Sequence, residues 1–315
     1  MPTKPEEIWP NFFIVGAARA GTTSLYYYLN EIPGVYMSKF KEPCYFSPHY
    51  IQRYPGETIT DNEEYLRLFE NASSYIAVGE ASPSYLWDPD SPKLIHQAVP
   101  TARIIILLRD PIERAYSHYL QNMKFKAHGK KLSFYHDLMR DYKRQERVYG
   151  ISPLYVEFSM YYEQVKRYFD QFGRQQVKVI IYEEFIQHPE QTVNDVLAFL
   201  GLNYTVTAIR KQYNPYNPHS VLRNPFSVWV FSFFRWLRAR GIKTSKVTTL
   251  LPASLTWSLE EKLLFKKAQK PKIEPEAFKF LQEIYHDDVL KLESLLGRSL
   301  PWPAVSSSSN IMKRE

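Results

Sequence analysis

The sequence predicts an α/β protein with a doubly wound parallel sheet flanked by helices. Short runs rich in Ile, Val and Phe are typical of buried parallel strands, and they lie at residues 12–15, 75–78, 103–108 and 177–182. Helical patterns alternate with these runs and cover residues 22–30, 111–123, 161–172 and 189–200. Ligands of such sheets bind beyond the carboxyl ends of the strands, which directs attention to the turns after the first three runs.

Local signals set the limits of the helices. The first helix opens at Thr22, directly after the first strand, and the second opens after the third strand with Asp110 as its N-cap. The last of the four patterns starts with Pro189 in its first turn and ends at Gly201. Apolar residues at three- and four-residue spacing predict a further amphipathic helix over 132–142, packed on the core.

Composition supports a sizeable core and excludes several classes of protein. The 315 residues are 44% hydrophobic and 16% aromatic, which excludes a disordered or fibrous chain. A net charge of +7 favours anionic ligands without selecting one. The single cysteine, Cys44, cannot form an intramolecular disulfide, so we expect a reducing compartment, the cytoplasm. The longest apolar segment, 226–237, is shorter than the roughly 20 residues that cross a bilayer, so we expect no transmembrane segment.

The chain is expected to form one domain over residues 7–302, with its core at 11–202. Residues 203–302 are rich in Tyr, Phe, Pro and basic residues, and they predict a helical and loop lid over the substrate. Residues 303–315, which include a serine run, predict a disordered tail.

The turn after the first strand has the composition of a phosphate-binding loop. Residues 16–24, GAARAGTTS, nearly match G-x-x-x-x-G-K-[ST]. Gly16 and Gly21 let the backbone curl with its N–H groups inward, and the helix that begins at Thr22 presents its positive end to an anion. Thr22 stands at the position of the usual lysine, so we expect a donor shorter than a triphosphate, with Arg19 as the cation of the loop. The alternative is a turn that packs strand against helix and binds nothing.

The turn after the third strand carries a second set of anion-binding groups. Asp110 and Glu113 predict a capping box that starts the following helix, which leaves Arg109 at the tip of the strand. Ser117 lies two turns into that helix, and we expect it to hold an anionic group together with Arg109. Two anion sites predict one bisphosphorylated ligand. The alternatives are an ion pair of Arg109 with its neighbours and a serine that bonds its own helix.

These motifs resemble the sulfotransferases that use 3′-phosphoadenosine 5′-phosphosulfate (PAPS), especially the heparan-sulfate type and its bacterial relatives. The resemblance covers most of residues 11–202 through GAARAGTTSLYYYL, RDPIERAYSHYLQ and the late IIYEEF and FLGL segments. It implies a P-loop-like α/β fold and metal-free transfer of a sulfuryl group to a hydroxyl or amine. The nucleotide-binding residues that it implies are Ala18, Arg19, Ala20, Gly21, Thr22, Thr23, Ser24, Arg109, Ser117, Ser159 and, in a late loop, Arg223.

The resemblance also assigns catalytic roles. KFKEPCYF at 39–46 is similar to a family motif whose glutamate is the general base, which implies that Glu42 is the base, with His49 as the fallback. Arg19 stands at the position of a family lysine that acts on the leaving phosphate. A second family lysine is replaced by Ala81, and Lys39, Lys41 or Ser82 could compensate for it. Glu80 is either a second carboxylate or a partner of Arg19; the candidate substrate contacts are Lys41, Glu80, Tyr85 and His49.

Two other functions compete with this interpretation. A small-molecule kinase on the same loop is disfavoured, because Thr22 replaces the lysine and the third strand ends in Arg109 and not in aspartate. A basic binding module could contact a membrane surface through the aromatic and arginine-rich stretch 226–240. No nucleic-acid motif or metal-ligand spacing of His and Cys is present, so we expect a glycan or small-molecule acceptor and no metal. Oligomeric state stays open.

Overall fold

The computed structural model describes residues 7–50, 58–125, 132–145, 153–209, 220–222, 265–267 and 270–306 of the chain. A five-stranded sheet forms its centre, with strands in the order β2-β3-β1-β4-β5. The strands are β1 (Phe12–Gly16), β2 (Val35–Met37), β3 (Ala77–Ala81), β4 (Arg103–Leu108) and β5 (Val177–Ile181). Every neighbouring pair in this sheet runs parallel, which confirms the predicted fold class.

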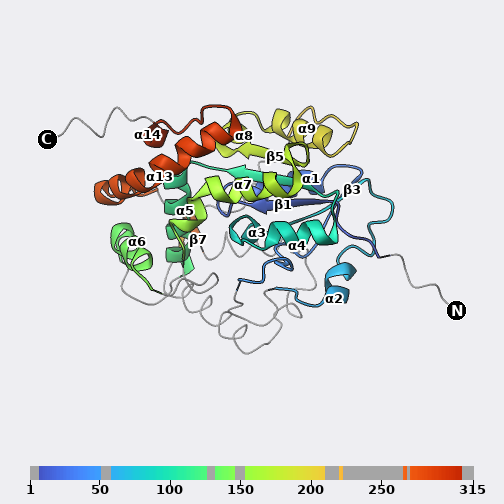
Figure 1. Ribbon diagram of the computed structural model, residues 1–315, viewed down its shortest axis with the longest axis horizontal. Coiled ribbons are helices and arrows are strands. Elements are labelled where there is room, and N and C mark those ends of the chain that lie inside the picture. Colours follow the sequence, from blue (N-terminus) through green and yellow to red (C-terminus); the bar gives the residue numbers. More distant parts are fainter. Residues whose placement is uncertain are drawn as a thin grey trace.

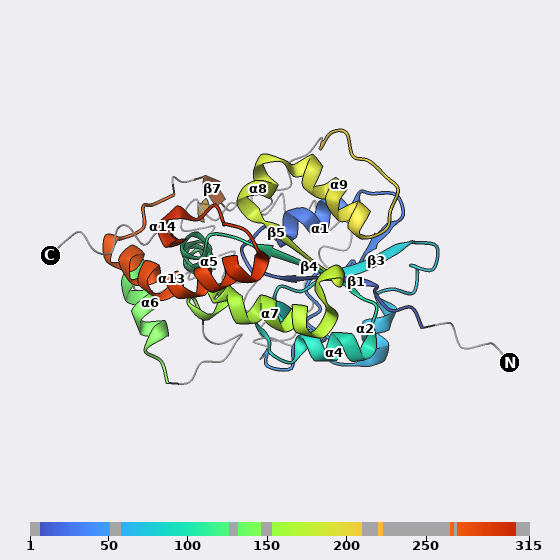
Figure 2. The same cartoon turned by 45° about the horizontal axis from the view of Figure 1, so that its top comes forward.

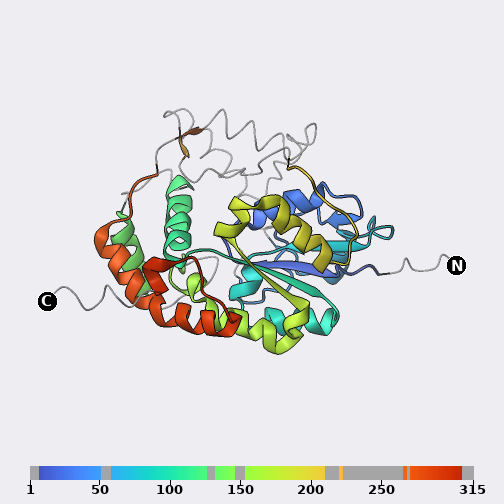
Figure 3. The ribbon, with the colours of Figure 1, turned by 90° about the horizontal axis from the view of Figure 1, so that it is seen from above.

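Helices cover both faces of the sheet (Figure 1, Figure 2). One face carries α1 (Thr22–Asn30), α8 (Tyr182–Gln187) and α9 (Pro189–Phe199); the other carries α3 (Ser84–Trp87), α4 (Ser91–Ala98) and α7 (Tyr161–Phe172). Seen from above, α5 (Pro111–Phe125), α6 (Phe134–Tyr142) and α13 (Pro275–Leu296) stand together beside the sheet (Figure 3). The remaining described helices are α2 (Asn62–Arg67), α14 (Pro303–Ser306) and the single turns Glu157–Ser159 and Arg174–Gln176.

The sheet core is apolar because its central strands are covered on both faces. All five residues of β1 and residues 104–108 of β4 are buried. From β1 the chain runs to β2 and β3 on one side, and it then returns to β4 and β5 on the other. The loops after β1 and β4 therefore leave the sheet at its topological switch point, where α/β proteins bind ligands.

Two strands differ from the prediction. The run predicted at 75–78 is displaced: Tyr75 and Ile76 are exposed, and β3 begins only at Ala77. Gly79 lies inside β3 and packs under Phe12, where a Cβ atom would come within 2.3 Å of the ring. In the sequence this glycine resembled the end of a strand, which is why the predicted run stopped at residue 78. The three-residue edge strand β2 was missed because it is too short to show a period.

Much of the C-terminal region that was predicted as a lid belongs to the core instead. Five side chains of α13 are fully buried, and the helix packs on α7 and reaches α5 and α6. The predicted disordered tail is wrong at its start, because residues 303–306 form α14 and Val305 is buried. Of the expected lid, the structure describes the antiparallel pair β6 (Ser220–Leu222) and β7 (Phe265–Lys267), besides residues 203–209. The stretch 226–240 and residues 307–315 lie outside the described residues.

A helix that crosses a bilayer needs about 20 predominantly apolar residues. Within the described part of the chain, no helix is both long and apolar enough to span a membrane.

Candidate active site

The loop after β1 is held tightly against its neighbours. Gly21 has a φ of 91°, and a Cβ atom there would come within 2.9 Å of the Tyr182 ring, so this position requires glycine. The N–H of Ala17 donates to the carbonyl of Leu107 in β4 (2.6 Å). The N-cap residue Gly21 makes no side-chain hydrogen bond to the first turn of α1, and N–H groups at a helix start are the groups that bind anions.

Other members of the loop line or support this site. Ala18 and Thr23 are partly exposed, whereas Ala20 and Thr22 are buried. Ser24 is partly exposed on the first turn of α1.

Arg19 joins the first predicted anion site to the second. Its backbone is in the left-handed region, with a φ of 72°. Its Nε donates to Ser117 Oγ on α5 (3.2 Å), and its carbonyl accepts a hydrogen bond from Arg109 Nη1 (3.3 Å). The structure thus brings together three residues that the sequence placed at two different turns.

The Arg109 side chain is held in place by its neighbours and, within the residues that the structure describes, has one unused hydrogen-bond donor. It lies over the Tyr182 ring, 4.8 Å from the centroid, and its Nη2 is 3.5 Å from Glu113 Oε2. Its Nε is buried and has no hydrogen-bond partner among the described residues. A buried guanidinium donor of this kind fits a phosphate oxygen, because charge-assisted hydrogen bonds repay its desolvation.

The capping of α5 corrects one prediction. Asp110 is the N-cap, since its Oδ1 accepts from the N–H groups of Ile112 (2.9 Å) and Glu113 (3.0 Å). Glu113 does not complete the box. The N–H of Asp110 donates to Glu183 Oε1 (3.1 Å), while the Glu113 carboxylate contacts Arg109 and Lys270. Glu113 therefore forms ion pairs with two cations, Arg109 and Lys270.

Lys270 is a candidate site residue that sequence analysis missed. It contacts Glu113, and its Nζ lies 5.4 Å from the centroid of the Tyr116 ring. The Tyr116 hydroxyl donates to the carbonyl of Pro271 (3.0 Å), which fixes this segment against α5. No motif marks Lys270, because its neighbours in space lie about 150 residues earlier in the chain.

Ser159, which was predicted to bind the nucleotide, is instead hydrogen-bonded inside the protein. It is fully buried, donates to the carbonyl of Pro111 (3.1 Å) and accepts from Arg114 Nε. Arg114 is also fully buried, and its Nη2 donates to the carbonyl of Tyr155 (2.7 Å). Ser159 therefore supports the start of α5 and satisfies a buried guanidinium. Arg223 lies outside the described residues.

The loop with the predicted base crosses the carboxyl end of β3. The N–H of Glu42 donates to the carbonyl of Ala81 (3.1 Å), and the N–H of Cys44 donates to Ser82 Oγ (3.1 Å). The Glu42 carboxylate is half exposed and pairs with Lys41, whose side chain is only 20% exposed. Lys39 is exposed. Of the two lysines proposed to compensate for Ala81, Lys41 is thus the one that contacts the predicted base.

Two predicted substrate contacts are instead internal. Glu80 is fully buried and accepts hydrogen bonds from Tyr65, Ser82 and Tyr85 (3.0, 2.7 and 2.7 Å). Burial raises the pKa of its carboxyl to about 7, and the donated hydrogen bonds oppose that rise. Tyr85 is buried as well, so neither residue can touch an acceptor directly. Glu80 is buried because it belongs to β3 and not to the turn after it, and Tyr85 is buried on α3.

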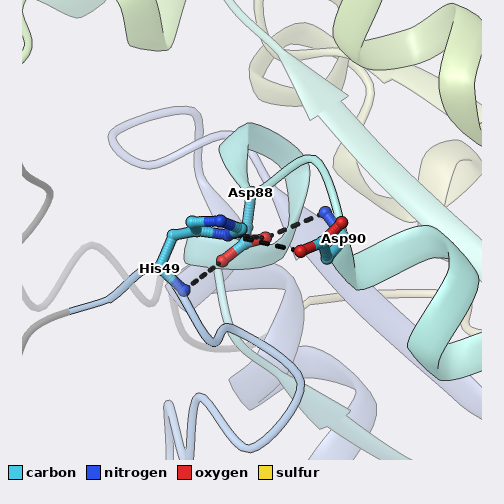
Figure 4. Close-up of side chains that lie close together, drawn as sticks. All are labelled: His49, Asp88 and Asp90. Atoms are coloured by element: carbon cyan, nitrogen blue, oxygen red, sulfur yellow. Dashed lines mark hydrogen bonds and ion pairs between the residues drawn. The ribbon is translucent and has the colours of Figure 1, made fainter.

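His49, the fallback base, lies in a cluster with Asp88 and Asp90 (Figure 4). Its Nδ1 is 3.1 Å from Asp88 Oδ1 and 3.7 Å from Asp90 Oδ2, and ligand atoms of the three residues lie within 4.8 Å of one another. The cluster could thus hold a metal, although no motif in the sequence suggested it. Asp88 is fully buried and also accepts from Ser47 Oγ and from the N–H groups of His49 and Asp90. These hydrogen bonds satisfy the buried carboxylate of Asp88 without a metal ion.

Comparison with known proteins defines the class. The family model of the sulfotransferase family matches residues 10–206, and the chain belongs to this family. A crystal structure of a sulfotransferase from Alicyclobacillus acidocaldarius is 32% identical, with a TM-score of 0.68, over 93% of this chain and 98% of that one.

Curated relatives are larger proteins. Human carbohydrate sulfotransferase 15 is 27% identical over 254 residues, covering 61% of this chain and 44% of the relative. Mouse bifunctional heparan sulfate N-deacetylase/N-sulfotransferase 4 is 25% identical over 197 residues, covering 61% of this chain and 22% of the relative. The matches thus span less than half the length of these two relatives.

Proposed function

We propose that this protein transfers a sulfuryl group from PAPS to a hydroxyl or amine of an acceptor, with Glu42 as the general base. One observation carries the proposal: Arg19, Arg109 and Ser117 converge beside the uncapped N-terminus of α1. Two adjoining sets of anion-binding groups suit a nucleotide that carries both a 5′-phosphate and a 3′-phosphate on its ribose. Membership of the sulfotransferase family supports the same reaction.

Each end of the donor has its own protein groups. The N–H groups of the loop and of α1 bind the 5′-phosphosulfate. Arg109 and Ser117 bind the 3′-phosphate; Ser117 Oγ accepts from Arg19 and so keeps its own proton to donate. Arg19, which lies between the two ends, offsets the charge that develops on the leaving 5′-phosphate.

The acceptor approaches from the side of the base loop. Glu42, at the end of β3, takes the proton of the attacking hydroxyl as the new S–O bond forms and the bond from sulfur to the 5′-phosphate breaks. Lys41 forms an ion pair with this carboxylate at the edge of the base loop. We propose a glycan or a small molecule as the acceptor, since one relative is named a carbohydrate sulfotransferase and the other a heparan sulfate N-sulfotransferase.

Calorimetric titration with 3′-phosphoadenosine 5′-phosphate (PAP), beside ATP with and without magnesium, tests the donor site. PAP should bind without magnesium, and Arg109→Ala should weaken it about 10- to 100-fold through the lost charge-assisted hydrogen bonds. Arg67→Ala is a matched control, because Arg67 is exposed on α2 and should leave PAP binding unchanged. Preference for ATP with magnesium would favour the kinase, and the absence of nucleotide binding would favour the binding module.

Acceptor screening then tests the reaction. Radiolabelled PAPS is offered with a panel of glycan oligosaccharides and phenols. Glu42→Gln should lower kcat about 100-fold or more and leave PAP binding intact, because the base acts on the acceptor and not on the nucleotide.

A further inference from the structure

The loop that carries Glu42 rests on a buried carboxyl group. Glu80 lies in β3, is fully buried, and accepts a hydrogen bond from each of three hydroxyl groups. No step of the proposed transfer uses it. Burying a carboxylate costs free energy unless hydrogen bonds compensate for it. The groups that donate these hydrogen bonds therefore indicate what Glu80 holds in place.

Each residue that donates to Glu80 also contacts the base loop. Ser82 Oγ accepts from the N–H of Cys44 (3.1 Å), and the Tyr85 hydroxyl accepts from the N–H of Phe46 (3.3 Å). The third hydroxyl belongs to Tyr65, whose ring stacks on Tyr45 at 4.2 Å with an interplanar angle of 12°. The residues that follow Glu42 are therefore fixed at three successive positions through one carboxyl group.

The base loop needs this external support because its own backbone is unfavourable. Glu42 has a φ of 63° and Cys44 a φ of 52°, both in the left-handed region that residues other than glycine avoid. Such conformations cost about 1 kcal/mol or more each and persist where surrounding contacts fix them. The bond from the Glu42 N–H to the Ala81 carbonyl anchors one side of the loop, and the Glu80 cluster anchors the other.

We propose that Glu80 is a positioning residue, which aims Glu42 at the acceptor through Ser82, Tyr85 and Tyr65. This inference rests on the proposed role of Glu42 as the base. Glu80 suits the task because its carboxylate, once ionised, only accepts, and three donated protons can converge on it. Glutamine in its place would turn an N–H group toward a hydroxyl and force at least one of the three to rotate away.

The test is a double-mutant cycle between Ser82→Ala and Glu42→Gln. Ser82→Ala cuts the connection from Glu80 to Cys44 and leaves both phenols on the carboxylate. We expect it to lower kcat about tenfold for transfer from PAPS to the best acceptor of the panel, with the Kd of PAP unchanged. In the Glu42→Gln background the same substitution should have no further effect, because a misplaced base cannot matter once the base is gone.

Two further variants keep the test falsifiable. Glu80→Gln and Tyr85→Phe should lower kcat in the same way, and Tyr36→Phe serves as the control. Tyr36 donates to the carbonyl of Leu68 away from the base loop, so its phenol should be dispensable for kcat. If Glu80→Gln fails to fold, Ser82→Ala and Tyr85→Phe carry the test.

The outcomes separate this inference from the proposed function. Equal losses from Ser82→Ala with and without Glu42 would show that the cluster acts elsewhere and would overturn the positioning role alone. A kcat within about twofold of wild type in both Ser82→Ala and Tyr85→Phe would do the same. Wild-type kcat in Glu42→Gln itself, with PAP still bound, would overturn the base assignment and the positioning role with it.

Discussion

Replacing Glu80 by glutamine should remove a pH dependence of stability that the buried carboxyl creates. Burial raises the pKa of this carboxyl from 4.5 to about 7 in the folded protein. The unfolded chain exposes the same group, which then releases its proton near its ordinary value. Between these two values folding takes up a proton, so the free energy of unfolding falls as the pH rises through the window.

The size of the effect follows from the two pKa values. A pKa difference between 4.5 and about 7 corresponds to roughly 3 kcal/mol in the free energy of unfolding. This contribution is present in full below pH 4.5 and is lost progressively as the pH rises to about 7. Glutamine is neutral throughout. The free energy of unfolding of wild type, minus that of Glu80→Gln, should therefore fall by about 3 kcal/mol from pH 4 to pH 8. Burial also raises the pKa of Asp288, to about 6, but Asp288 is present in both proteins and cancels in the difference.

Urea unfolding at a series of pH values, followed by tryptophan fluorescence, measures this difference. Glu63→Gln is the matched control, because Glu63 is 80% exposed on α2 and should give no slope in the window. A difference between wild type and Glu80→Gln that stays constant with pH would refute the reasoning, since it would mean that the folded protein ionises Glu80 as easily as the unfolded chain does.

Three other substitutions test neighbouring parts of the structure. Glu113→Gln removes a carboxylate that competes with phosphate for Arg109 and Lys270, so PAP should bind about threefold tighter at low salt and equally at high salt; weaker binding would contradict this. Gly79→Ala places a methyl group 2.3 Å from the Phe12 ring and should cost about 3 kcal/mol or more in urea unfolding, whereas unchanged stability would show that the sheet adapts. His49→Asn, whose amide can keep the hydrogen bond to Asp88, should leave kcat within about threefold of wild type; a loss as large as that of Glu42→Gln would make His49 the base.

Local sequence signals predicted much of the fold. The helix predicted at 22–30 and the helix predicted at 161–172 are confirmed to the residue as α1 and α7. The N-cap at Asp110 is confirmed as well. These features depend on residues adjacent in the chain, so the sequence alone contains the information for them. The failures at β2 and β3 arose where a strand was too short, or where a glycine inside a strand resembled its end.

The candidate site divides in the same way. The loop at 16–24, Arg109 and Ser117 were found from the sequence because each lies directly after a recognisable strand or in the helix that follows it. The sheet topology then brings the strand ends together. The orientation of a side chain has no such local signal. Ser159 and Tyr85 sit in motifs that suggested contact with ligands, yet both are fully buried.

By itself, the sequence determined the fold class and which turns carry anion-binding groups, because strand and helix periods and capping residues act over a few neighbouring positions. Only the tertiary structure decided which of those groups face the crevice and which support it. Lys270 joins Glu113 across 157 residues of chain, and Tyr65 of α2 joins Glu80 of β3. Burial and hydrogen bonding of that kind depend on contacts between distant segments, which exist only once the sheet and its helices have packed.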